Sequence, residues 1–140
     1  MAYIDTSVLA AYYCPEPLSR SVQRALATVK EPVISPLVEV EFYSAIAAKV
    51  RRRELEAAWA RQILAMFRGH IADGWYGMVP IETEEYSIVR DWLGRFTSPL
   101  RAPDALHLAA ALANDLTLLT ADKNLSRSAG IFKVRCKLVG

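Results

Sequence analysis

Apolar residues occur along the chain in short continuous runs and in longer stretches with helical spacing. The short runs predict buried strands, since each is too brief for a helix. They lie at Tyr3–Ile4, Val33–Ser35, Met78–Ile81, Leu116–Thr120 and Phe132–Val139. The longer stretches repeat apolar side chains every three or four positions and predict amphipathic helices. They cover Val8–Tyr13, Ser19–Val29, Leu37–Arg52, Glu54–Ile71, Thr83–Gly94, Asp104–Asn114 and Asp122–Ser128.

Strands that alternate with helices are typical of a parallel sheet covered by helices. The chain has 140 residues, which is enough to bury a substantial core, and it shows no repeat, linker or low-complexity segment. We therefore predict one α/β domain over residues 1–140, with a central, mostly parallel β-sheet flanked by helices on both faces.

Large aromatic residues are predicted to lie mostly in the core, and some of them are candidates for an oligomer interface. One group extends the apolar face of the Glu54–Ile71 helix, where Leu55, Trp59, Ile63 and Phe67 fall in register. The other aromatic residues of this set are Trp75, Tyr76 and Trp92.

The composition is more apolar than average, with 53% hydrophobic residues and a mean hydropathy of +0.15. A chain of this size cannot bury all of that surface, so we expect part of it to meet a partner or a second copy. The net charge is +2 and the pI is near 8.6. This balance weakly favours an anionic partner and does not by itself indicate nucleic acid.

Cysteine and histidine are too few and too scattered for a usual structural zinc site. Cys14 and Cys136 form no CxxC motif and are expected to be free thiols of a reducing cytosol, and His70 and His107 are the only histidines. The N-terminus lacks the pattern of a signal peptide, and no apolar run approaches the ~18 residues of a membrane span. We expect a soluble, cytoplasmic protein.

Four carboxylates are predicted to converge at one edge of the sheet. Asp5 and Asp122 each follow directly on an apolar strand. In a parallel sheet these strand ends share one edge, where open α/β folds place their ligands. Asp104 begins a helix that leads back to the strand before Asp122, and Glu41 lies about one turn into the helix after Ser35. Both are therefore expected near the same edge.

Each acid also has a simpler explanation. The three aspartates stand at helix starts, where a carboxylate accepts backbone N–H bonds and suits the helix dipole. For the glutamate, helical spacing does not choose between Glu39 and Glu41, because both have apolar neighbours. Taken together, however, converging carboxylates could not all ionise without a counter-charge. Oxygen-only ligation suits Mg²⁺ or Mn²⁺, which can activate water and stabilise a phosphoryl group in transit.

Four segments in this order resemble a PIN domain, and more closely the VapC toxins of bacterial and archaeal type II toxin–antitoxin pairs. They are Asp5-Thr6-Ser7, Ser35 through Ala45, Asp104 through Ala109, and Thr120 through Leu125, and the match spans nearly the whole chain. The resemblance selects Glu41 over Glu39, because the glutamate of the family precedes a hydrophobic-X-Ser-Ala segment. Pro103 before Asp104 and Ala48 before Lys49 depart from a typical member without removing an acid.

The resemblance implies an endoribonuclease that depends on Mg²⁺ or Mn²⁺, cuts RNA and acts as a toxin. Asp5, Glu41, Asp104 and Asp122 match the acidic quartet of the family. Asp5 and Asp104 would be the principal metal ligands, while the other two acids would complete the shell through metal or water. Such toxins usually form homodimers and are neutralised by an antitoxin whose C-terminal segment lies over the groove.

Three hydroxyl residues match accessory positions of the family and could bond to a carboxylate or a phosphate. They are Thr6, Ser7 and Thr120. Helix capping or strand-end hydrogen bonding is an alternative role for each of them. His107 follows Asp104 by three positions on one helix face, where we expect a hydrogen-bonded structural histidine rather than a substrate contact.

Two groups of basic residues are candidates for RNA binding. The run that contains Arg51 and Arg52 could grip a phosphate backbone, although a charge run at a helix end is more often a solvated face. Lys133, Arg135 and Lys137 alternate along the predicted last strand and would share one face. That stripe could bind RNA or protect an edge strand from aggregation.

Two other functions are compatible with parts of the sequence. A catalytically silent PIN-like module could bind RNA or a protein, but such a module would have no need to keep four acids together. An aspartyl phosphotransferase or a response-regulator receiver also has an aspartate after the first strand. Residue 7 is serine where a dehalogenase-like phosphatase requires a second aspartate, and the paired acids of a receiver are missing.

Overall fold

Five parallel strands form the central sheet, and every connection between them contains at least one helix. The computed structural model describes residues 1–140. The strands follow the order β3-β2-β1-β4-β5, and all four neighbouring pairs are parallel. Their bounds are β1 Ala2–Ile4, β2 Pro32–Ile34, β3 Gly77–Met78, β4 Thr117–Thr120 and β5 Cys136–Leu138.

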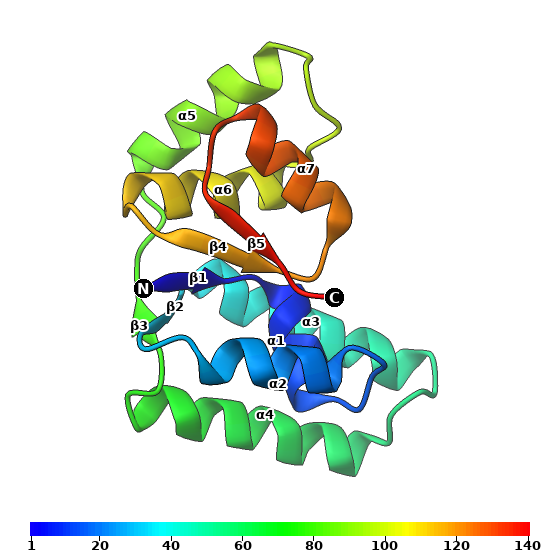
Figure 1. Cartoon of the computed structure of the whole chain (residues 1–140). Helices are drawn as coiled ribbons and strands as arrows, with labels where there is room; N and C mark the ends of the chain where they lie inside the picture. The colour runs from blue at the N-terminus through cyan, green and yellow to red at the C-terminus, as the bar shows by residue number, and fades with distance from the viewer.

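Seven helices cover the two faces of this sheet. They are α1 Thr6–Tyr13, α2 Ser19–Ala27, α3 Pro36–Arg51, α4 Ala57–Ala72, α5 Thr83–Gly94, α6 Ala102–Ala113 and α7 Lys123–Ile131. Helices α1 to α4 lie on one side of the sheet and α5 to α7 on the other (Figure 1). The predicted α/β fold is confirmed, and the sheet is entirely parallel. No helix is both long and apolar enough to cross a membrane.

The chain reverses its direction across the sheet between β1 and β4. From β1 it moves outward to β2 and β3, then crosses back to β4 on the other side of β1. Open α/β sheets bind ligands at such a switch point, outside the carboxyl ends of the strands. Tyr3 pairs with Leu118 and Ile4 with Leu119, so Asp5 emerges next to Thr120.

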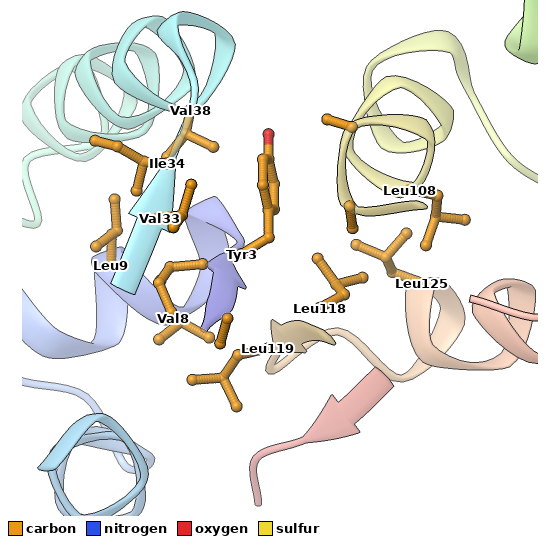
Figure 2. Packing of buried hydrophobic residues seen from close by; sticks show 14 of the residues in the cluster. Tyr3, Val8, Leu9, Val33, Ile34, Val38, Leu108, Leu118, Leu119 and Leu125 are labelled. Carbon is orange, nitrogen blue, oxygen red and sulfur yellow. The ribbon is translucent and has the colours of Figure 1, made fainter. Parts of the chain in front are cut away.

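The core is one cluster of 33 buried hydrophobic residues that fills both sides of the sheet. Figure 2 shows Leu108, Leu118 and Leu125 close together on one side, while Leu9 and Ile34 lie on the other. Burial of each such side chain contributes about 1.5–3 kcal/mol. This packing holds β1 and β4, which carry the predicted site, in the most buried part of the fold.

The last strand is shorter than predicted. The apolar run indicated a strand over Phe132–Val139, but β5 covers only Cys136–Leu138. Lys133 has φ of 58°, so the chain turns there instead of extending. Phe132 ends α7 and stacks on Trp92 with ring centroids 4.5 Å apart. Its burial therefore comes from helix packing, which an apolar run cannot distinguish from a strand.

The apolar face of α4 also differs from the prediction. Leu55 precedes the helix, and Trp59 is 52% exposed, because the buried face consists of Ala60, Ile63 and Phe67. Among the aromatic residues assigned to the core, Trp75 is 50% exposed as well. The others, Phe67, Tyr76 and Trp92, are buried as predicted.

Candidate active site

A polar cavity of about 460 Å³ opens at the carboxyl ends of β1 and β4. Its lining includes all four predicted carboxylates, which are Asp5, Glu41, Asp104 and Asp122. They come from four elements: the end of β1, helix α3, the first turn of α6 and the start of α7. The topology therefore brings together acids that are distant in the sequence.

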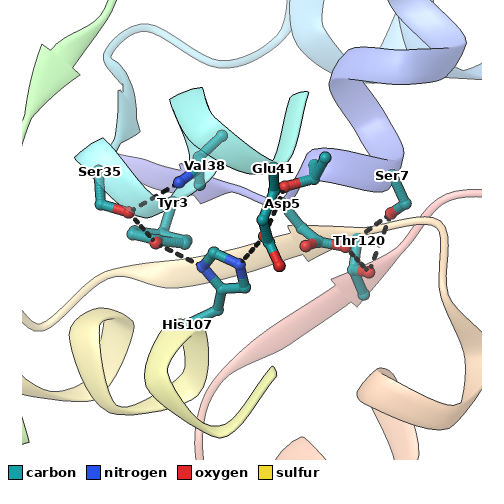
Figure 3. Close-up of polar contacts among 9 residues, drawn as sticks. Tyr3, Asp5, Ser7, Ser35, Val38, Glu41, His107 and Thr120 are labelled. Atoms are coloured by element: carbon teal, nitrogen blue, oxygen red, sulfur yellow. Dashed lines mark hydrogen bonds and ion pairs between the residues drawn. The ribbon is translucent and has the colours of Figure 1, made fainter. Parts of the chain in front are cut away.

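Asp5 is held by two hydroxyl groups and does not cap the helix that follows it. The carboxylate is 5% exposed and makes no side-chain bond to the N-terminus of α1. Ser7 Oγ and Thr120 Oγ1 donate to Asp5 Oδ2 at 2.7 and 2.8 Å (Figure 3). The Ser7 oxygen in turn accepts the backbone N–H of Ala121 at 3.0 Å. Both hydroxyl bonds end on Oδ2, which leaves Oδ1 for a ligand.

Glu41 is fixed by a chain of buried side chains that starts at β1. Thr6 Oγ1 donates to Glu41 Oε1 at 2.9 Å, and His107 Nε2 bonds to the same oxygen. Figure 3 shows the His107 ring between Glu41 and Tyr3, whose hydroxyl lies 2.7 Å from Nδ1. The Tyr3 hydroxyl also contacts Ser35 Oγ at 2.7 Å. His107 is fully buried with both ring nitrogens bonded, which confirms the predicted structural histidine.

The surroundings of Glu41 favour its ionised form. Burial alone raises the pKa of this carboxyl. The hydrogen bond and the charge of His107, together with the Thr6 hydroxyl, outweigh that effect and lower the pKa below its ordinary value. Because both partners bond to Oε1, the second oxygen of Glu41 remains free toward the cavity.

Asp104 and Asp122 differ in their bonding. Burial raises the pKa of Asp104, and the negative charges of Asp5, Asp122 and Glu41 raise it further against the opposing effect of His107. Asp122 caps α7, because its Oδ1 accepts the backbone N–H groups of residues 124 and 125 at 2.8 and 3.2 Å. The capping role is therefore correct for Asp122, although its side chain also lines the cavity.

The basic residues predicted to bind RNA lie in different places. Arg52 lines the carboxylate cavity, whereas Arg51 lines an apolar groove between α3 and α4. Lys133 and Arg135 precede β5, so the predicted continuous stripe on one strand is wrong. Arg135 bonds to Asp115, which lies two residues before β4 begins. This place is at the amino end of the strand, opposite the end where the carboxylates lie. Lys137 is exposed on β5 beside Leu119.

Sequence reasoning missed the hydroxyl groups behind His107 and one cation of the cavity. The pattern places Tyr3 on a strand and Ser35 at the start of a family-like segment without a role for either hydroxyl, and it gives Lys49, which lines the cavity, no function. A tyrosine in a fully buried strand needs a hydrogen-bond partner for its hydroxyl, and a buried histidine needs two. These hydrogen-bonding requirements can be recognised in the sequence. Only the fold shows that the tyrosine and the histidine are partners of each other.

The carboxylate oxygens of the cavity are ligands of the kind that a hard divalent cation prefers. The cavity offers four carboxylates, and burial together with the charges of the other three raises the pKa of Asp104. No three His, Cys, Asp or Glu side chains are close enough to form a preformed metal cage. Mg²⁺ usually retains several waters and is held by one or two carboxylates, so such a cage is not required.

Comparison with protein families gives one match over most of the chain. Residues 2–131 match the PIN domain. No curated protein matches the sequence.

Solved structures with the same fold include several bacterial toxins. VapC20 of Mycobacterium tuberculosis, described as a toxin that cleaves the sarcin-ricin loop, is 17% identical with a TM-score of 0.71, over 91% of this chain and 95% of that chain. VapBC2 of Rickettsia felis, bound to a DNA fragment from its promoter, is 16% identical with a TM-score of 0.72, over 100% of both chains. FitAcB of Neisseria gonorrhoeae is 17% identical with a TM-score of 0.70, over 97% and 96%.

At these identities the solved structures establish a shared fold and nothing finer. The family match is independent of them and extends over all four carboxylates and over the strands that carry Asp5 and Asp122. The five-stranded parallel sheet and its acidic cavity agree with that match. The chain belongs to the PIN-domain family.

Proposed function

We propose that this protein is a metal-dependent endoribonuclease that hydrolyses RNA phosphodiester bonds and acts as the toxin of a toxin–antitoxin pair. The observation that carries the proposal is the gathering of Asp5, Glu41, Asp104 and Asp122 in one polar cavity. Two of these acids, Asp5 and Glu41, each keep one oxygen free of hydrogen bonds while the other oxygen is fixed. Carboxylates fixed in this way are prepared to bind a cation or a water molecule.

Asp5 and Asp104 would hold Mg²⁺ or Mn²⁺, and Glu41 and Asp122 would complete the shell directly or through water. PIN-domain nucleases generally use divalent metals, which supports this assignment. When bound, the cation makes water more acidic and offsets negative charge on the phosphate. The raised pKa of Asp104 supports a cation in the cavity, because burial and the neighbouring carboxylates raise it more than His107 lowers it.

Glu41 is the residue best prepared to orient the attacking water by accepting a hydrogen bond from it. Its pKa is lowered, so it is ionised at neutral pH, and His107 and Thr6 fix its direction. A base must lie within hydrogen-bond reach of the proton that it takes. The free Oε2 of Glu41 would make that contact from the wall of the cavity.

A catalytically silent module that binds RNA or a protein is the alternative. It would share the fold and the cavity but would show no turnover. The hydroxyl groups on Asp5 and the buried chain behind Glu41 favour the enzyme, since a binding surface needs no such fixed carboxylates. We therefore place the binding module second.

The deciding experiment is an RNA cleavage assay with the purified chain in Mg²⁺, in Mn²⁺ and in EDTA. We expect cleavage in both metals, none in EDTA, and a loss of about 100-fold or more in Asp5→Asn, as is usual for essential catalytic groups. Asp115→Asn is the matched control, because Asp115 is an exposed acid at the opposite sheet edge. Metal-dependent cleavage by a folded Asp5→Asn protein would contradict the assignment, and no cleavage by any folded form would favour the binding module.

A further inference from the structure

One face of helix α3 runs from one end of the cavity to the other. This face is negatively charged at its amino end and positively charged at its carboxyl end. Glu41 lies near the amino end of this face, and Lys49 and Arg52 lie near its carboxyl end. The residues between them on the cavity wall are small, namely Ser44, Ala45 and Ala48. Their size leaves the floor of the cavity open along the helix.

The two cations are the only basic residues of the cavity lining. They lie eight and eleven residues after Glu41 along α3, whereas the three aspartates come from the end of β1 and the starts of α6 and α7. A polyanion that entered the acidic end alone would be repelled, because like charges a few ångströms apart interact strongly near a protein surface. The basic end can therefore bind a part of the polyanion that the acidic end does not hold.

Lys49 is positioned by an ion pair that a stronger anion can replace. Its Nζ lies 3.3 Å from Glu16 Oε1, and the two side chains are 23% and 29% exposed. Glu16 belongs to the loop between α1 and α2, where its backbone N–H donates to Ser19 Oγ at 2.9 Å. Partly exposed ion pairs are weak, so a backbone phosphodiester with two non-bridging acceptor oxygens can compete for the ammonium group.

We propose that Lys49 and Arg52 form a second binding subsite. This subsite holds a backbone phosphate of the RNA other than the phosphate at the cleaved bond. This inference rests on the proposed function and adds the direction in which the strand lies. Lys49 follows Glu41 by eight residues, which corresponds to about 12 Å along the helix axis. At a stacked rise of ~3.4 Å per nucleotide this is three to four nucleotides, and fewer for an extended strand. The RNA strand thus runs along α3, with the cleaved bond at Glu41.

The test is the salt dependence of binding of a short, fluorescein-labelled single-stranded RNA, followed by anisotropy in EDTA. Each phosphate contact on a single strand contributes about 0.7 to the slope of log K against log salt. Because the two cations share one phosphate, we expect the double variant Lys49→Gln/Arg52→Gln to reduce that slope by about 0.7, and each single variant to reduce it by a part of that amount. Glu16→Gln should tighten binding about twofold, because it frees Lys49. Arg90→Gln is the matched control and should leave the slope unchanged, since Arg90 is an exposed residue of α5, on the opposite side of the sheet from α3 (Figure 1).

The outcomes separate this proposal from the one on which it rests. If Lys49→Gln and Arg52→Gln keep the full slope while the wild type still cleaves RNA with metal, the subsite is wrong and the nuclease stands. An equal loss in Arg90→Gln also overturns the subsite, because binding is then spread over the whole surface. If the folded wild type neither binds nor cleaves RNA, both proposals fail. Circular dichroism of each variant confirms that the fold is retained.

Discussion

At the scale of single residues, the hydrogen bonds of His107 determine which way Glu41 faces. A carboxylate can only accept, so Nε2 must donate to Glu41. When the ring is neutral, Nδ1 is then an acceptor and the Tyr3 hydroxyl donates to it. The Ser35 hydroxyl donates to Tyr3 in its turn. Tyr3 therefore keeps a neutral ring in the tautomer that donates to Glu41, and the Tyr3 oxygen can instead accept from Nδ1 when the ring is charged.

Tyr3→Phe tests this chain without touching the cavity, since Tyr3 is fully buried. The change leaves His107 Nδ1 and the Ser35 hydroxyl without their partner, so we expect a loss of about 1–3 kcal/mol in the free energy of unfolding. Metal-dependent cleavage should also fall, because the ring can adopt the tautomer that turns a lone pair toward Glu41. Urea denaturation and the cleavage assay measure the two effects. Tyr86→Phe, on a tyrosine that is 52% exposed, is the control. Equal behaviour of the two variants would show that the chain has no role.

Asp104→Asn tests the repulsion among the carboxylates. The pKa of Asp104 is raised in the folded protein, so the folded state binds the proton more tightly than the unfolded state. Charged Asp104 therefore destabilises the fold above its folded pKa, and this effect disappears as pH falls below the ordinary pKa of aspartate. In EDTA at neutral pH we expect the variant to melt at a higher temperature than the wild type, and at pH 3 at the same temperature or a lower one.

Metal should reverse that order at neutral pH. A ligand that binds only the folded state stabilises it by about 2.7 kcal/mol at 100 times its Kd. We expect Mn²⁺ to raise the melting temperature of the wild type and to have little effect on Asp104→Asn. Asp115→Asn, which changes an exposed acid outside the cavity, should respond like the wild type. An equal Mn²⁺ response in Asp104→Asn would remove this residue from the metal site.

Two aspartates with the same local position show what the sequence could and could not predict. Asp5 and Asp122 both follow an apolar strand and precede a helix, which placed them correctly in one cavity. Only Asp122 caps its helix, whereas the Asp5 side chain is held by Thr120. That difference depends on the pairing of β1 with β4, which joins residues more than a hundred positions apart. Local pattern carries no information about it.

At the scale of elements, helices and strands were predicted more reliably than their ends. Strand β4 is sheltered on both faces, so its apolar run matches its extent closely. Near the C-terminus the same kind of run includes Phe132, which packs from the end of a helix, and Val134, which follows a turn. On α4, a shift of one position exchanges exposed Trp59 for buried Ala60. Helix α4 packs closely against the core at Ala60, so a side chain as large as tryptophan does not fit on its buried face there.

The contact between Phe132 and Trp92 ties the end of α7 to α5 and can be tested directly. Phe132 is 8% exposed, so Phe132→Ala removes a buried ring and leaves a cavity beside Trp92. We expect a loss of about 3–5 kcal/mol in the free energy of unfolding, measured with urea. Phe96→Ala is the matched control, because Phe96 is 92% exposed and should change stability by no more than about 0.5 kcal/mol. Similar losses in the two variants would contradict this account of the C-terminal segment.

At the scale of the whole molecule, the chain exposes more surface than its mass accounts for. The accessible surface is 8155 Å² for 15.6 kDa. The usual scaling for a folded monomer of this mass gives about 7,200 Å². The excess of roughly 900 Å² is close to the ~800 Å² that one partner contributes to a standard protein interface. Large apolar side chains such as Val40 and Trp59 lie on this surface at 68% and 52% exposure.

We therefore expect the purified chain to be a homodimer, as the resemblance to VapC toxins also implies. Light scattering during size-exclusion chromatography should give twice the mass of 15.6 kDa. The melting temperature should rise with protein concentration, since dissociation accompanies unfolding. A mass of one chain and a constant melting temperature across about 1–100 μM would contradict the dimer. The exposed apolar surface would then be left for a different protein, and the proposed antitoxin would be the first partner to test by co-expression.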